Sequence, residues 1–188
     1  MITGVIKNKV DKIWTDIWAG GITNPLTVIE QLTYLMFIRS LDEKELETEE
    51  FENMTGEKMD KIFPQSAVGQ SMRWSKFKNN DPREIYDVIS RRVFPAIKSM
   101  KHGRLPDFNE QGEMVEAGDD SASDTQNETA FARYMSDAIF LIPTPQVLQK
   151  IITGLDDLYE HDIADRDMQG DLYEYMLGKL ATAGQNGQ

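Results

Sequence analysis

The most apolar stretch of the chain, residues 25–41, constrains the fold more than any other feature. It follows Asn24 and begins with Pro25, a capping residue and then the residue best tolerated at the first helical position. Apolar side chains then occupy nearly the whole helical circumference, as in a helix at the centre of a core. We expect a central helix over residues 25–45, with the acidic stretch 42–52 emerging into solvent.

Helical periodicity recurs along much of the chain. Asp81-Pro82-Arg83-Glu84 has the form of a capping box, and Gly20-Gly21 ends the first apolar-periodic segment. We predict core helices over residues 4–19, 25–45, 82–94, 145–158 and 165–183, with shorter pieces near 96–101 and 131–139. No segment alternates strongly enough to require a sheet. The sequence therefore predicts an all-α fold, a multi-helix bundle that forms a single domain over residues 1–188.

Residues 102–128 interrupt the helical pattern. They are rich in Gly, Asp, Glu, Ser and Asn, and such a composition buries too little apolar surface to offset the entropy of ordering. We expect a long, irregular, flexible acidic loop, with a short hairpin near residues 108–115 that turns at Glu110-Gln111-Gly112.

Composition excludes several classes of protein. The chain has 20 Lys and Arg against 32 Asp and Glu, a formal charge of −12, which argues against a protein that coats nucleic acid. The absence of cysteine excludes disulfides, thiolate nucleophiles and Cys-based zinc sites. No stretch has the pattern of a signal peptide or the length of a membrane span, so we expect a soluble cytoplasmic protein.

Motifs that would indicate a self-contained active site are missing from the sequence. There is no glycine-rich phosphate loop and no pair of histidines at metal-ligand spacing. His102 and His161 are expected at the surface, and the carboxylate pairs Asp119-Asp120 and Asp156-Asp157 are expected to be solvated. We predict no catalytic, cofactor-binding or metal-binding residues.

Residues 70–104 depart from the acidic average. They hold nine Lys and Arg against three acids, a local charge of +6, which leaves −18 for the rest of a chain whose total is −12. Charge separation of this size creates a directed field. Eight of its nine cations, all except Arg83, are the residues that we predict to contact DNA: Arg73, Lys76, Lys78, Arg91, Arg92, Lys98, Lys101 and Arg104.

Two interpretations of the basic segment stay open. Its cations either face a polyanion or partner, or they pair with the acidic helix end at residues 42–52. In the same way, Trp74, which lies near Phe77 among the cations, either stacks on an unpaired base or fills the core.

Three stretches resemble the modification (DNA methyltransferase) subunit of type I restriction-modification systems. The first runs from Ile13-Trp14 through Asn24-Pro25 to the core helix 29–39, and the second is the Arg73-Trp74-Ser75 element. The third and most specific is Gly-Asp-Leu-Tyr-Glu-Tyr-Met-Leu at residues 170–177. The resemblance covers essentially the whole chain, as the family's N-terminal helical domain, and it implies that the catalytic methyltransferase domain follows residue 188.

The resemblance carries functional expectations. The intact subunit methylates adenine N6 with S-adenosylmethionine, at sites chosen by a specificity subunit, in complexes with a second modification subunit and a restriction subunit. Asn24-Pro25 is followed by Leu26, so it is not the family's catalytic Asn-Pro-Pro-Phe motif. We therefore expect a non-catalytic domain without a cofactor of its own that contacts DNA and the specificity subunit. The alternatives are a pure protein-assembly module and an acidic DNA-mimic inhibitor.

Overall fold

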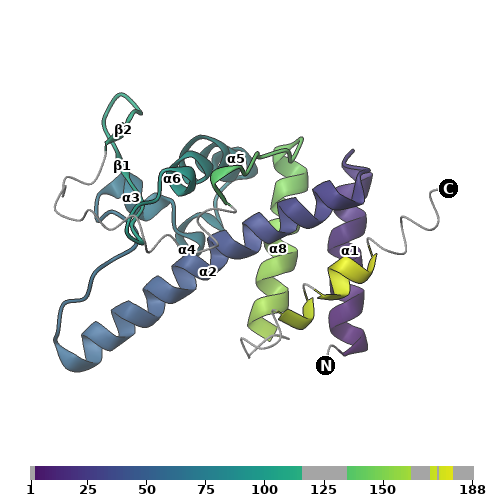
Figure 1. Cartoon of the computed structure of the whole chain (residues 1–188), viewed down its shortest axis with the longest axis horizontal. Helices are drawn as coiled ribbons and strands as arrows, with labels where there is room; N and C mark the ends of the chain where they lie inside the picture. The colour runs from purple at the N-terminus through teal and green to yellow at the C-terminus, as the bar shows by residue number, and fades with distance from the viewer. Residues whose placement is uncertain (1–2, 116–134, 162–169, 173, 180–188) are drawn as a thin grey trace. The chain divides into compact units, whose positions relative to one another are not determined.

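The computed structural model (Figure 1) describes residues 3–115, 135–161, 170–172 and 174–179. Its helices are α1 (Gly4–Ala19), α2 (Pro25–Thr55), α3 (Ala67–Ser71), α4 (Trp74–Phe77), α5 (Pro82–Val88), the π-helical turn η1 (Ile89–Val93), α6 (Phe94–Lys98) and α8 (Pro145–His161). Residues 170–172 and 174–179 are also helical. One small hairpin is the only sheet in these described ranges. The all-α prediction is confirmed.

The tertiary contacts group the chain into two compact units. Unit 1 comprises residues 1–36 and 141–188, and unit 2 comprises residues 37–140. Helix α2 belongs to both, because the division falls after Met36. The single domain expected from the sequence stays a prediction, and the two units are described separately.

In unit 1, α1 packs against α8. The predicted first helix is confirmed: the side chain of Thr3 caps it by accepting the N–H of Ile6 at 3.3 Å. A Cβ at Gly154 of α8 would lie 2.8 Å from Cγ1 of Ile13, so a glycine is needed for this close approach of the two helices. The buried residues of the pair are Ile6, Val10, Ile13, Ile17, Leu148, Ile151, Ile152, Leu155, Leu158 and Tyr159.

The first part of α2 is a core helix, as predicted. Asn24 caps it by accepting the N–H of Leu26 at 2.9 Å. Its buried residues in unit 1 are Val28, Ile29, Gln31, Leu32, Tyr34 and Leu35. A small apolar cavity marks where α1, α2, α8 and the C-terminal helical residues meet, and it is lined by Val10, Ile13, Leu32, Met36, Leu155, Leu158, Leu172 and Met176.

In unit 2, α2 continues to Thr55, so the predicted end at residue 45 is wrong. Residues 46–55 contain no proline or glycine, and several of their side chains are good helix formers. The helix ends at Gly56, which has a φ of +74° and donates its N–H to the carbonyl of Glu52 at 2.8 Å.

Helices α5 and α6 form one continuous helical segment through η1, although the sequence predicted an end at Phe94-Pro95 and a separate helix at 96–101. The start is as predicted, because Asp81 accepts the N–H of Arg83. Proline removes a helical hydrogen bond and crowds the carbonyl four residues before it. Here Phe94 donates its N–H to Ile89, five residues back, and this wider turn admits Pro95.

The predicted hairpin is present. Strand β1 (Asp107–Phe108) pairs antiparallel with β2 (Met114–Val115), and Asn109 accepts the N–H groups of Gln111 and Glu113 within the turn. Gly112 has a φ of +80°. Residues 116–134 lie outside the described ranges. They include the rest of the predicted loop, with Asp119-Asp120, and the start of the helix expected at 131–139. The helix expected over 165–183 is described only at 170–172 and 174–179.

Candidate nucleic-acid interface

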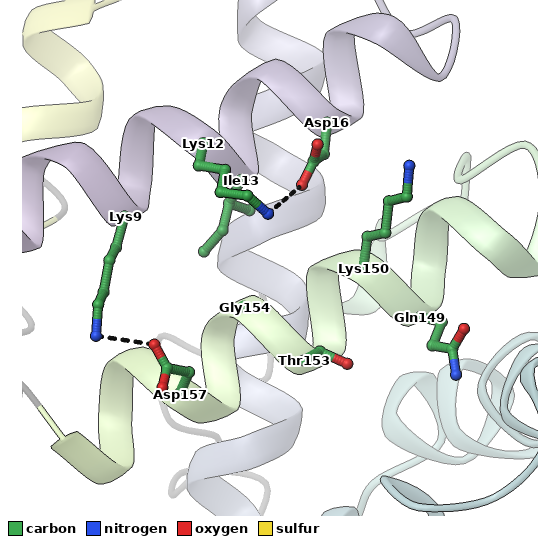
Figure 2. Close-up of a pocket in the computed structure, with 9 residues that line it drawn as sticks. All are labelled: Lys9, Lys12, Ile13, Asp16, Gln149, Lys150, Thr153, Gly154 and Asp157. Carbon is green, nitrogen blue, oxygen red and sulfur yellow. Dashed lines mark ion pairs between the residues drawn. The ribbon is translucent and has the colours of Figure 1, made fainter.

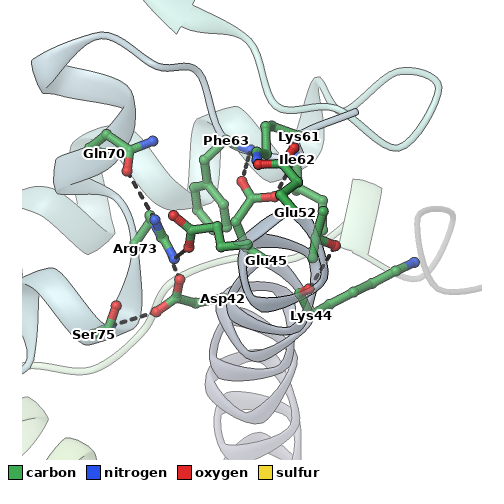
Figure 3. Close-up of polar contacts among 12 residues, drawn as sticks. Asp42, Lys44, Glu45, Glu52, Lys61, Ile62, Phe63, Gln70, Arg73 and Ser75 are labelled. Carbon is green, nitrogen blue, oxygen red and sulfur yellow. Dashed lines mark hydrogen bonds and ion pairs between the residues drawn. The ribbon is translucent and has the colours of Figure 1, made fainter. Parts of the chain in front are cut away.

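The acidic half of α2 forms a polar face that turns inward in unit 2 (Figure 3). Asp42, Glu45, Glu49 and Glu52 follow one another at spacings of three, four and three residues, which places them on one side of a helix. Asp42 is 2% exposed and Glu45 is 1% exposed. The prediction that residues 42–52 emerge into solvent is therefore wrong for this face, because each of the four carboxylates has partners within the unit.

Arg73 occupies the centre of this polar face. Its Nε donates to Oδ1 of Asp42 at 2.6 Å, Nη1 donates to Gln70 at 3.0 Å, and Nη2 donates to Glu49. Burial opposes the charged form, but the hydrogen bonds to Glu49 and Asp42 outweigh it and raise the pKa of Arg73. The side chain is 3% exposed, so Arg73 is an internal cation and leaves the set predicted to contact DNA.

The same carboxylates accept hydrogen bonds from backbone N–H groups that have no partner within a helix. Glu45 accepts the N–H of Ile62 at 3.0 Å and that of Phe63 at 2.8 Å, and Asp42 accepts the N–H of Ser75 at 2.7 Å. Glu52 accepts from the ammonium of Lys61, and this hydrogen bond is the main cause of its lowered pKa. Residues 59–75 are thus attached to α2 by polar contacts, including those of the Arg73-Trp74-Ser75 element.

Trp74 and Phe77 both lie in the core of unit 2. Trp74 is 3% exposed and Phe77 is fully buried, and their ring centroids are 5.6 Å apart. Both rings are too deeply buried to stack on a nucleic-acid base, so both fill the core.

The other cations predicted to contact DNA are more exposed than Arg73. Lys78 and Arg92 are half-buried, and Arg92 lies over the ring of Phe108 at 4.9 Å. Arg91 approaches Asp87 at 3.8 Å, and Arg104 lies 2.9 Å from Asp60, both in ion pairs with exposed partners. Such pairs contribute little and exchange easily with other anions. The exposed cations of the segment are Lys76, Arg83, Arg91, Lys98, Lys101 and Arg104.

Unit 1 contains a groove of about 390 Å³ between α1 and α8 that the sequence did not predict (Figure 2). Lys9 pairs with Asp157 across the two helices at 2.8 Å, and Lys12 pairs with Asp16 at 3.6 Å within α1. The hydrogen bond from Lys9 lowers the pKa of Asp157. These ion pairs neutralise the charges of two lysines that line the groove. The cationic segment of unit 2 is therefore the stronger candidate for binding an anion.

Among the described residues, neither histidine belongs to a group of side chains that could hold a metal ion. His102 and His161 are exposed, as predicted. In the part of the chain that the structure describes, no group of three or more His, Cys, Asp or Glu side chains is placed to hold a metal ion. Within those same ranges, no helix combines the length and apolarity that crossing a membrane requires.

This helical chain matches the family model of the HsdM N-terminal domain over residues 6–155. The match covers most of the chain, and the chain therefore belongs to this family, the N-terminal domain of the modification subunit of type I restriction-modification systems. The stretch 170–177, on which the sequence resemblance relied most, lies outside the matched residues. Neither curated proteins nor solved structures gave a match.

Proposed function

We propose that this chain is a non-catalytic domain of a type I DNA adenine-N6 methyltransferase subunit, which contacts DNA and the specificity subunit. S-adenosylmethionine binding and methyl transfer would belong to a further domain of the intact protein, and the second modification subunit and the restriction subunit would join the larger complex. Family membership supports the assignment to the subunit. The observation that carries the DNA contact is the set of exposed cations on residues 76–104.

The electrostatics favour phosphate contacts in this segment. Its local charge is +6 in a chain of −12, and the buried Arg73 accounts for only one of its nine cations. Contacts to phosphate position a protein without reading sequence. Each phosphate that is neutralised releases counterions, so about four contacts would give a slope of log K against log salt near −4.

Fluorescence anisotropy of a labelled duplex tests this proposal. The chain is titrated alone and with the specificity subunit at about 50 and about 200 mM salt, over which several phosphate contacts weaken binding by about 10² or more. The triple variant Arg91→Glu, Lys98→Glu, Lys101→Glu should lose most of the affinity at low salt. The matched control Lys44→Glu, Lys58→Glu, Lys150→Glu makes the same change in net charge at exposed lysines outside the segment and should lose much less affinity. The absence of binding at low salt, with and without the specificity subunit, would refute the DNA contact.

The pure assembly module is the second candidate, because apolar side chains of α2 are exposed in unit 2. If the triple variant assembles poorly but binds DNA normally, the cations serve a protein contact. The DNA-mimic alternative requires carboxylates spread over an exposed face. Asp42 and Glu45 do not meet that requirement because they are buried and bonded within unit 2.

A further inference from the structure

The second half of α2 has an unusual distribution of polarity. From Asp42 to Thr55, the carboxylates of Asp42 and Glu45 are buried, while the large apolar side chains face solvent. Leu46 is 48% exposed, Phe51 is 46% exposed and Met54 is 79% exposed. A helix on a protein surface normally places these two classes of residue the other way round.

Helical geometry places the exposed apolar residues together. At about 100° per residue, Leu46, Met54 and Phe51 fall within an arc of about 140°, centred roughly opposite the polar inner face. The helix cannot rotate to bury them without breaking the contacts of Asp42 and Glu45 with Arg73, Ser75, Ile62 and Phe63. The apolar residues are therefore held in solvent by the polar contacts on the other side.

Three glutamates lie within the same arc. Glu43, Glu47 and Glu50 are exposed, and their positions on the helix interleave with those of the apolar residues. Glu43 also forms an ion pair with Arg39 at 3.3 Å. We call these six residues the outer face of α2. Large apolar side chains gathered on one surface typically mark a binding site for another macromolecule. The charge of this surface indicates which kind.

We propose that the outer face of α2 docks a basic amphipathic helix of a partner protein. Leu46, Phe51 and Met54 would cover its apolar stripe, and the glutamates would meet its flanking Lys and Arg residues. A two-fold contact between two copies of the face would oppose glutamate to glutamate, and the same charge disfavours DNA. The inference deepens the protein-contact part of the proposed function, on which it rests for the expectation that the partner is a subunit of the same complex.

Peptide binding to the full chain tests the docking face. The probe is a labelled 20-residue peptide with Leu at helical i, i+3, i+4 spacing and Lys elsewhere, followed by anisotropy, and the matched probe replaces Lys by Glu. The variant Leu46→Gln, Phe51→Gln, Met54→Gln keeps the net charge and uses a good helix former. The control variant Met114→Gln, Val115→Gln, Ile139→Gln removes exposed apolar residues elsewhere in unit 2. Circular dichroism confirms that both variants fold.

We expect the Lys probe to bind the wild type at least tenfold more tightly than the Glu probe. The outer-face variant should lose at least tenfold in affinity, and the control variant less than twofold. Equal binding of the Lys probe to all three proteins would overturn the proposal, because the negative chain would then attract the peptide without this face. A concentration-dependent dimer that the outer-face variant abolishes would also overturn it. Probe binding without association with the specificity subunit would refute only the proposed partner.

Discussion

The two halves of α2 differ in how much charge they bury. In unit 1, residues 25–36 bury leucine, isoleucine and valine among the apolar residues of α1 and α8. In unit 2, residues 37–55 bury Ile38 and Leu41 and, beyond them, Asp42 and Glu45 against a guanidinium and backbone N–H groups. Whether a helix face is buried therefore depends on the residues that pack against it, and not only on the polarity of its own side chains.

The two halves also differ in what their stability depends on. Apolar burial is non-directional and tolerates exchange between side chains of similar volume. Buried charges need partners at defined positions, because a charge that loses its partner keeps the full cost of desolvation. The second half of α2 therefore specifies one arrangement of residues 59–75, whereas the first half specifies mainly a volume to be filled.

The largest effect is expected for Asp42→Ala. Removing this carboxylate leaves Arg73 without its closest buried partner and the N–H of Ser75 without an acceptor. Breaking a buried ion pair from one side costs about 3–5 kcal/mol, so urea denaturation should show a loss of that size. The control is Glu50→Ala, which removes an exposed carboxylate of the same helix. A loss below about 1 kcal/mol for Asp42→Ala would mean that the polar face is not a source of specificity.

Leu35→Ala in the apolar half should cost about 3 kcal/mol through lost burial and the cavity left behind. Leu35→Met nearly conserves volume and should cost less than about 1.5 kcal/mol. The same denaturation experiment measures both changes. Equal losses for the two variants would show that this half also demands a defined side-chain shape.

Glu45→Ala should cost about 2 kcal/mol, because the N–H groups of Ile62 and Phe63 lose their acceptor. Glu45→Gln keeps one acceptor oxygen and should cost about half as much. Amide hydrogen exchange of Ile62 and Phe63 reports the effect directly, with Glu50→Ala as an exposed control. Unchanged protection of both amides in Glu45→Ala would contradict this account.

Acid should weaken the polar half in a defined range. The pKa of Glu52 is lowered, first by the hydrogen bond from Lys61 and then by the N–H of Met59. The contribution of Glu52 to stability is therefore present above its unfolded pKa of about 4.3 and is lost as the pH falls through the lower folded pKa. NMR titration should give Glu52 a pKa below that of a glutamate in an unfolded peptide. Glu52→Gln should remove this part of the acid dependence.

The smallest change in stability is expected on the outer face of α2. Met54→Gln replaces a 79% exposed side chain by a good helix former, so the free energy of unfolding should change by less than about 0.5 kcal/mol. The same substitution should weaken binding of the Lys probe. Marked destabilisation would mean that Met54 packs within this chain rather than against a partner.

Much of the local structure follows from the sequence alone. The cap at Asn24 and Pro25, the start at Asp81 and the turn at Asn109 to Gly112 are determined by residues within a few positions of one another. The apolar periodicity of α1, α8 and residues 25–36 likewise predicts which faces enter a core. These elements were predictable because their causes are local or periodic.

The tertiary structure decided which charged side chains are buried. Isolated carboxylates avoid burial, so the sequence favours solvent for residues 42–52. It leaves open whether Arg73 faces a polyanion or pairs with these carboxylates, and the structure shows the pairing. The 3-4-3 spacing of Asp42, Glu45, Glu49 and Glu52 reveals one helix face but not its direction. That direction depends on Arg73, which is 31 residues away from Asp42 along the chain. These charges can be buried only as a group, because each carboxylate needs a partner to offset its desolvation. Only the fold brings those partners into contact.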